Sequence, residues 1–91
     1  MSDVVRKRVV VSGQVQGVFF RDSTRREAGR RGVAGWVCNR GDGAVEAVFE
    51  GPATEVQALV AFCSSGPRGA DVESVTTSDE EPEGLDGFEV R

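Results

Sequence analysis

The sequence contains no histidine and no tyrosine. Imidazole is the usual general base beside a serine or cysteine nucleophile, and it is also the commonest zinc ligand. The absence of histidine therefore excludes the Ser-His and Cys-His catalytic systems and makes a zinc centre improbable. Any chemistry that this chain performs must do without imidazole.

Cysteines and long apolar runs are also scarce. Cys38 and Cys63 are the two cysteines, and such isolated thiols are expected to stay reduced rather than to form a disulfide framework. No apolar run approaches the about 20 residues that span a bilayer, and residues 1–8 are charged, unlike a signal peptide. We therefore expect a cytoplasmic protein without membrane contact, with a single domain over residues 1–91 because a chain this short buries only one core.

Charge is divided unevenly along the chain. Residues 1–45 hold nine Lys and Arg against four Asp and Glu, a net charge of +5, whereas residues 46–91 hold two against eleven, a net charge of −9, which together give −4. Local positive potential in the first half could attract a small anion. The acidic total makes nucleic acid a poor partner, and the sequence lacks the aromatic set of an RNA-binding sheet.

Hydrophobic patterning predicts five strands and two helices. The β-branched run around residues 9–11 favours a buried strand, and the Asp-Gly pair at residues 42–43 is typical of a hairpin turn. The predicted strands are residues 4–12, 33–38, 44–50, 72–78 and a last short strand with Phe88 and Val90 on one face. The predicted helices are residues 20–31 and the segment between Gly51-Pro52 and Gly66-Pro67. The first six of these elements follow the order β-α-β-β-α-β, which predicts an α+β, ferredoxin-like sandwich, with two helices packed on one face of a mainly antiparallel sheet.

Side-chain spacing predicts which faces are buried. Phe20, Thr24 and Ala28 form one thin stripe on the first helix, which Gly32 should cap. The second helix repeats apolar residues at i, i+3, i+4 and i+7, namely Val56, Leu59, Val60 and Cys63. Trp36 is expected in the core, and the acidic stretch at residues 79–86 is expected to be a solvated loop.

The segment after the first strand has the properties of an anion-binding loop. Gly13 and Gly17 would let residues 13–18 curl so that the amides of residues 16–20 converge, beside the positive end of the following helix. Arg21 would add a planar cationic fork. The residues alone favour a plainer interpretation, a flexible connection followed by a surface arginine, because glycine-rich loops before helices are common.

Two segments resemble the signatures of the acylphosphatase family. Gly13-Gln14-Val15-Gln16-Gly17-Val18-Phe19-Phe20-Arg21 resembles the pattern G-x-V-Q-G-V-x-F-R, and Gly35-Trp36-Val37-Cys38-Asn39-Arg40-Gly41-Asp42-Gly43-Ala44-Val45-Glu46 resembles G-W-V-x-N-x-x-D-G-x-V-E. The chain length fits a small free-standing member of the family. One departure is Arg31, which stands where family members usually have leucine.

The resemblance implies a hydrolase that cleaves the carboxyl-phosphate bond of acyl phosphates by in-line attack of water, without metal or cofactor. Arg21 and Asn39 would be the catalytic residues, with Asn39 orienting the water. The phosphoryl group would be bound by Arg21 and by the loop residues Gln16, Gly17, Val18, Phe19 and Phe20. Without the resemblance, Asn39 beside a hairpin indicates a turn former.

Two other interpretations remain open at this stage. The chain could be a non-catalytic ferredoxin-like module that holds phosphate or a phosphorylated metabolite without turning it over. Cys38 could be imagined as a nucleophile, although no histidine is present to activate it. The expected partners are a small acyl phosphate and inorganic phosphate, with no nucleic acid and no membrane, and we expect a monomer.

Overall fold

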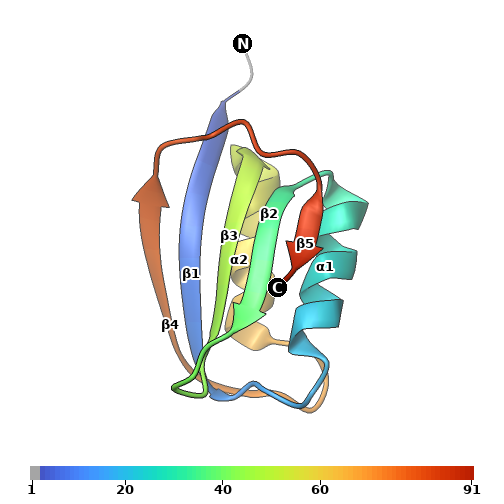
Figure 1. The fold of residues 1–91 in the computed structure, drawn as a ribbon, viewed down its shortest axis with the longest axis vertical. Coiled ribbons are helices and arrows are strands. Elements are labelled where there is room, and N and C mark those ends of the chain that lie inside the picture. Colours follow the sequence, from blue (N-terminus) through green and yellow to red (C-terminus); the bar gives the residue numbers. More distant parts are fainter. Residues whose placement is uncertain (1–2) are drawn as a thin grey trace.

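A five-stranded sheet carries both helices on one face (Figure 1). The computed structural model describes residues 3–91. The elements in chain order are β1 (Val4–Gln14), α1 (Phe20–Arg31), β2 (Ala34–Asn39), β3 (Val45–Pro52), α2 (Ala53–Ser65), β4 (Asp71–Glu80) and β5 (Phe88–Val90). The predicted fold class, the ferredoxin-like α+β sandwich, is confirmed.

The sheet has the strand order β4-β1-β3-β2-β5, and every neighbouring pair is antiparallel except β2 and β5. The register sets Val9 of β1 and Val37 of β2 on either side of Ala47 in β3. All three side chains are buried, because opposed residues of paired strands point to the same face. This face packs against the helices and forms the core.

The helices bury the stripes that the sequence predicts. Phe20, Thr24 and Ala28 are buried on α1, and the Thr24 hydroxyl is satisfied by donating to the Phe20 carbonyl at 2.8 Å. On α2 the buried residues are Val56, Leu59 and Cys63. Gly32 caps α1 in the left-handed region, with φ 67°, as predicted.

The prediction that Gly13 belongs to the loop is wrong. Gly13 lies inside β1, where it pairs with Val72 of β4 at a bulge in the register. A Cβ on Gly13 would lie 2.2 Å from the Asp71 carbonyl oxygen, and its φ is +125°. Glycine is required here because the backbone of β4 comes so close.

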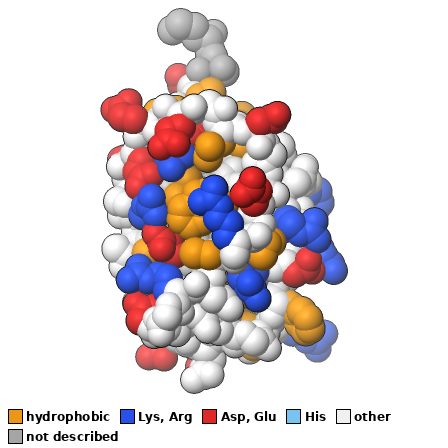
Figure 2. Space-filling view, in the orientation of Figure 1, with side chains coloured by type: hydrophobic (Ala, Val, Ile, Leu, Met, Phe, Trp, Pro, Cys, Tyr) orange, Lys and Arg blue, Asp and Glu red, His pale blue; other side chains and the backbone are white. Residues whose placement is uncertain are grey.

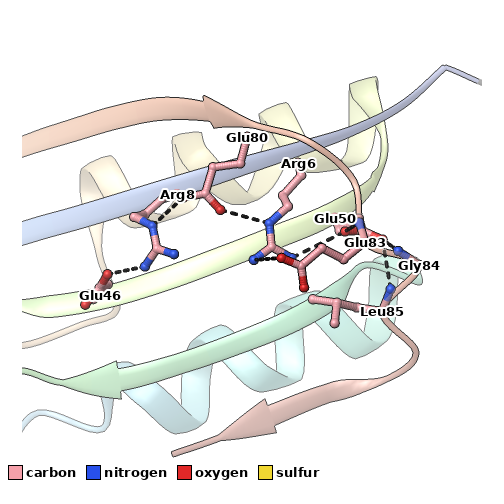
Figure 3. Close-up of polar contacts among 8 residues, drawn as sticks. All are labelled: Arg6, Arg8, Glu46, Glu50, Glu80, Glu83, Gly84 and Leu85. Atoms are coloured by element: carbon pink, nitrogen blue, oxygen red, sulfur yellow. Dashed lines mark hydrogen bonds and ion pairs between the residues drawn. The ribbon is translucent and has the colours of Figure 1, made fainter.

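The expectation of a solvated acidic loop at residues 79–86 holds for residues 81–86, which connect β4 to β5 and are mostly exposed, but it is wrong for Asp79 and Glu80. Asp79 and Glu80 belong to β4, and residues 83–85 are held by a buried carboxylate on β3 (Figure 3). The Oε1 atom of Glu50 accepts the Glu83 amide at 2.8 Å, and Oε2 accepts the amides of residues 84 and 85 at 2.8 and 2.9 Å. Burial alone would raise the pKa of Glu50, but these amides and Arg6 outweigh it and hold that pKa below its ordinary value.

Charged side chains on the helix-free face extend this contact into a network (Figure 3). Arg6 contacts Glu50, Glu80 and Glu83, and Arg8 contacts Glu80 at 2.6 Å and also pairs with Glu46. Hydrogen bonds to Glu80 raise the pKa of both guanidinium groups, and they lower the pKa of Glu80.

Trp36 is half-buried on the same helix-free face rather than in the core. The guanidinium carbons of Arg8 and Arg91 lie 5.4 and 4.9 Å from its ring centroid, which is cation-π distance. Figure 2 shows hydrophobic side chains in the middle of this face, with acidic and basic side chains among and around them.

Arg31, which stands where family members usually have leucine, joins the two helices. Its guanidinium contacts Glu27, one turn earlier on α1, and reaches Glu55 in the first turn of α2 at 3.2 Å. The side chain is about one-third exposed. A long charged side chain can cover apolar surface in this way while its head stays in water.

Candidate active site

A pocket of about 460 Å³ lies where the β1–α1 loop and the first turn of α1 approach the end of β2. These segments meet at the lower end of the sheet in Figure 1. The pocket is lined by residues from four parts of the chain, which are Val15, Gly17, Phe19, Phe20, Arg21, Asp22, Arg25, Asn39 and Val90. Five of the residues predicted for the site therefore share one cavity.

The loop presents backbone amides that have no acceptor within the described chain. No hydrogen bond within residues 3–91 uses the N–H groups of residues 16–20, and no side chain caps the start of α1. Helix-start amides without partners carry partial positive charge. An anion in the pocket would therefore meet N–H groups with free hydrogen-bonding capacity.

Two left-handed residues shape the loop. Gly17 has φ 75°, and Phe19 has φ 60°, the one positive φ of a non-glycine residue in the described part of the chain. For phenylalanine this conformation costs on the order of 1 kcal/mol. The Phe19 carbonyl accepts the Ser23 amide at 2.9 Å, so Phe19 forms the start of the helix in a strained backbone conformation.

Arg21 is exposed, and within residues 3–91 it pairs with no Asp or Glu side chain. Its hydrogen bond to the main-chain oxygen of Arg91, the last residue, is long, at 3.5 Å. Arg25 lines the same pocket one turn later, but Asp22 holds it at 2.9 Å. The hydrogen bond from Arg25 lowers the pKa of Asp22. Asp22 also pairs with Arg26 at 2.9 Å, so of the two arginines that line this pocket Arg21 is the one without an Asp or Glu partner within residues 3–91.

Asn39 is the last residue of β2 and is exposed at the pocket. The hairpin after it is closed by the Arg40 amide, which donates to the Ala44 carbonyl at 2.8 Å, and by the Asp42 carboxylate, which accepts the Ala44 amide at 3.1 Å. The turn is thus built by its own residues, which leaves the Asn39 side chain free to face the pocket.

Gln16 and Val18 were predicted with the binding residues, but their side chains do not line the pocket. The Gln16 amide nitrogen donates to the carbonyls of Arg40 and Ala44 at 2.8 and 2.9 Å. This pair of bonds fastens the loop to the hairpin that follows Asn39. Val18 packs against the core.

The sequence reasoning missed four lining residues, Val15, Asp22, Arg25 and Val90. Arg25 could have been found from its spacing, because residues four apart lie on one face of a helix. Val90 reaches the pocket only because β5 pairs in parallel with β2, setting it beside Val37. No local pattern in the sequence specifies that pairing.

Neither thiol belongs to the pocket. Cys63 is buried in the core, and burial raises the pKa of its thiol to about 12, so it stays protonated at neutral pH. Cys38 is half-buried. Within residues 3–91 no group of three or more Asp, Glu or Cys is arranged to hold a metal ion, and none of the helices there is long and apolar enough to cross a membrane.

Comparisons with known proteins agree with this geometry. The acylphosphatase family model matches residues 7–90. An acylphosphatase of Natronomonas pharaonis is 53% identical over 91 residues, covering 100% of this chain and 99% of the relative. An acylphosphatase of Rubrobacter xylanophilus is 60% identical over 87 residues, covering 94% of this chain and 79% of the relative.

The solved structure of an acylphosphatase from Coxiella burnetii superposes with a TM-score of 0.93 at 37% identity, covering 98% of this chain and 94% of that one. The family match spans nearly the whole described chain, and the fold agrees with it throughout. The chain therefore belongs to the acylphosphatase family, a family of hydrolases.

Proposed function

We propose that the chain hydrolyses acyl phosphates to a carboxylate and inorganic phosphate by in-line attack of water. The observation that carries this proposal is that Arg21 and Asn39, which come from different elements, line one pocket together with the loop. The family match supplies the substrate class. The three components supply what phosphoryl transfer needs, which is positioning and stabilisation of charge.

The phosphoryl group is bound by the amides of residues 16–20 and by Arg21. The amides have no acceptor within residues 3–91, and no Asp or Glu side chain there pairs with the guanidinium. A guanidinium fork and converging N–H groups match the equatorial oxygens, where charge develops in a loose, metaphosphate-like transition state. Preorganised donors of this kind can replace a metal ion.

Asn39 orients the attacking water. Its side-chain oxygen can accept a hydrogen bond from water and its NH₂ group can donate to the substrate, but a neutral amide cannot act as a strong base. The proton released by water passes to a phosphoryl oxygen of the substrate. Asn39 therefore contributes geometry rather than proton transfer.

The bonding changes balance without any further reactant. The water oxygen forms a new bond to phosphorus while the bond from phosphorus to the acyl oxygen breaks, and its electron pair leaves on the carboxylate. The acid conjugate to that leaving group has a pKa near about 4, so it departs without a proton from the protein. No protein nucleophile is needed, and we propose none.

The test is release of phosphate from benzoyl phosphate and acetyl phosphate with chelator present and no divalent metal added. We expect turnover far above the spontaneous rate, with inorganic phosphate as a competitive inhibitor. Phosphate binding without turnover would instead support a non-catalytic phosphate-binding module. Full activity that disappears with chelator and returns with metal would overturn the metal-free mechanism.

We further propose that the active form is a monomer, because residues of one chain line the whole pocket. Light scattering during gel filtration, combined with an assay across protein concentrations, tests this. The specific activity should not change with protein concentration. A specific activity that rises with self-association would contradict it.

A further inference from the structure

Two exposed hydrophobic side chains meet at the candidate pocket. Among residues 3–91 the large hydrophobic side chains that remain exposed are Val4, Phe19 and Val90, at 46%, 81% and 41%. Phe19 and Val90 both line this pocket, whereas Val4 opens β1 and lines a different cavity. Single exposed apolar residues are ordinary, but two at one pocket indicate a binding surface.

The backbone of Phe19 is fixed, although its ring is exposed. Its carbonyl accepts the Ser23 amide at 2.9 Å, and its left-handed conformation joins the loop to α1. The ring cannot turn into the core unless the start of the helix rearranges. An aromatic ring held in a strained, solvent-facing position is a feature to be explained by function, since such strain concentrates at ligand sites.

The pocket is larger than a phosphoryl group requires. Its volume of about 460 Å³ falls within the about 300–1,000 Å³ of clefts that bind small organic molecules. In an acyl phosphate the carbonyl carbon is joined to phosphorus through one bridging oxygen, so the rest of the acyl group begins only a few bonds away. With the phosphoryl group on Arg21, the acyl group must lie against neighbouring walls of this pocket.

We propose that Phe19 and Val90 bind the acyl part of the substrate and make the site selective for aromatic or bulky apolar acyl phosphates over small ones. This inference rests on the proposed function and deepens it. A flat acyl group gains contact with the Phe19 ring, whereas an acetyl group is too small to cover it. Phe19 and Val90 are thus specificity-determining residues at the mouth of the phosphate site.

Arg25 is the other guanidinium at this pocket, and it shares the Asp22 carboxylate with Arg26, each at 2.9 Å. Phe19 and Val90 are the exposed apolar part of the wall, and an apolar acyl group matches them.

The test compares kcat/KM for benzoyl phosphate and acetyl phosphate in wild type and in Phe19→Ala, Phe19→Gly and Phe19→Tyr. We expect the ratio of the two values to fall about tenfold in Phe19→Ala, which corresponds to about 1.4 kcal/mol, and to recover in Phe19→Tyr, which keeps the ring. Phe19→Gly also removes the backbone strain, so it should fold at least as well as wild type and still lose the ratio. Val90→Ala should shift the ratio in the same direction but less.

Val4→Ala is the matched control, since it removes an exposed apolar side chain outside this pocket, and its ratio should equal that of wild type. Equal losses on both substrates in the Phe19 variants would overturn the acyl-binding role while leaving the hydrolase intact. If wild type hydrolyses neither substrate, the proposed function itself fails, so the two failures are distinguishable.

Inhibition provides a readout without turnover. Phenylphosphonate and methylphosphonate present the same anionic group with a large or a small apolar substituent. We expect wild type to bind phenylphosphonate more tightly than methylphosphonate, and the difference to shrink about tenfold in Phe19→Ala. If the two inhibition constants are equal in wild type, the proposal is wrong.

Discussion

Two groups of backbone amides among residues 3–91 differ in whether the protein itself supplies an acceptor. At residues 83–85 three successive amides donate to the Glu50 carboxylate at 2.8 to 2.9 Å. At residues 16–20 the amides have no acceptor within residues 3–91. The first group is saturated by the protein itself, whereas the second is available to a ligand.

The arginines beside these amides differ in the same way. Arg6 contacts three carboxylates, whereas Arg21 pairs with no Asp or Glu side chain in the described chain. A guanidinium that is already paired stabilises structure and offers little to a ligand, since the incoming anion must displace a carboxylate. An arginine is thus assigned to fold or to function by its partners, which the sequence does not state.

Removing the free guanidinium should have the largest effect. We expect Arg21→Ala to lower kcat/KM for benzoyl phosphate by about a thousandfold, because the positive charge opposite the phosphoryl oxygens is lost, and to weaken inhibition by inorganic phosphate. Steady-state kinetics with chelator measures both. Arg30→Ala, at the other end of α1 and paired with Glu27, is the matched control. Unchanged phosphate inhibition in Arg21→Ala would contradict the assignment.

Asn39→Ala should impair the positioning of the attacking water without impairing the binding of phosphate. We expect kcat to fall about a hundredfold through loss of alignment, while inorganic phosphate still binds, since the amides and Arg21 remain. Asn39→Asp keeps the shape but sets a carboxylate beside the phosphoryl group, so it should weaken phosphate binding as well. Equal losses of kcat and phosphate affinity in Asn39→Ala would point to a structural role.

Glu50→Gln tests the saturated amides. We expect the free energy of unfolding to fall by about 2 kcal/mol at pH 7, since the buried carboxylate accepts hydrogen bonds from three amides and from Arg6. We expect little effect on kcat.

The depressed pKa of Glu50 stabilises the fold at pH values above the pKa of this group in the unfolded chain, about 4.3. This contribution is lost as the pH falls further. Urea unfolding of both proteins from pH 7 to pH 3 should show the difference shrinking, and Glu81→Gln, on an exposed side chain, should show none. A gap that stays constant across this range would exclude the charged form of Glu50 as its cause.

Gln16→Ala should lower activity less than Arg21→Ala or Asn39→Ala. It removes the two bonds of 2.8 and 2.9 Å that fasten the loop to the hairpin after Asn39, so we expect kcat to fall about tenfold through loss of alignment. Gln57→Ala, on the exposed side of α2, is the control. If Gln16→Ala has wild-type kcat, the loop and hairpin hold their positions without this side chain.

Much of the fold was predictable from local patterns. Phe20, Thr24 and Ala28 lie a turn apart and are buried as their spacing requires, and the Asp-Gly hairpin forms where the sequence predicts it. Trp36 was predicted in the core, but its ring is covered by the guanidinium groups of Arg8 and Arg91. Arg8 lies on β1 and Arg91 follows β5, so no local pattern around Trp36 indicates these contacts. The contact between the acidic loop and Glu50 was not predicted, because Glu50 is itself acidic and is bound through the amides of residues 83–85.

For the site, the resemblance of two short continuous motifs predicted the loop at residues 16–20, Arg21 and Asn39; the structure sets Arg21, Asn39 and part of the loop at one pocket, and their roles stay predictions. The sequence did not predict that the Gln16 side chain donates to the hairpin after Asn39 or that Val90 lines the pocket. Both contacts depend on which strands become neighbours. Their contacts join residues far apart in the chain, and no local propensity encodes such distances.

The sequence by itself determined the elements, their order and the chemistry available without imidazole, because these follow from local periodicity and from which side chains are present. Only the tertiary structure decided which arginines are paired, which amides have acceptors and which apolar side chains reach the pocket. The physical reason is that burial and pairing are properties of neighbours in space. Packing of the strands in the order β4-β1-β3-β2-β5 selects those neighbours.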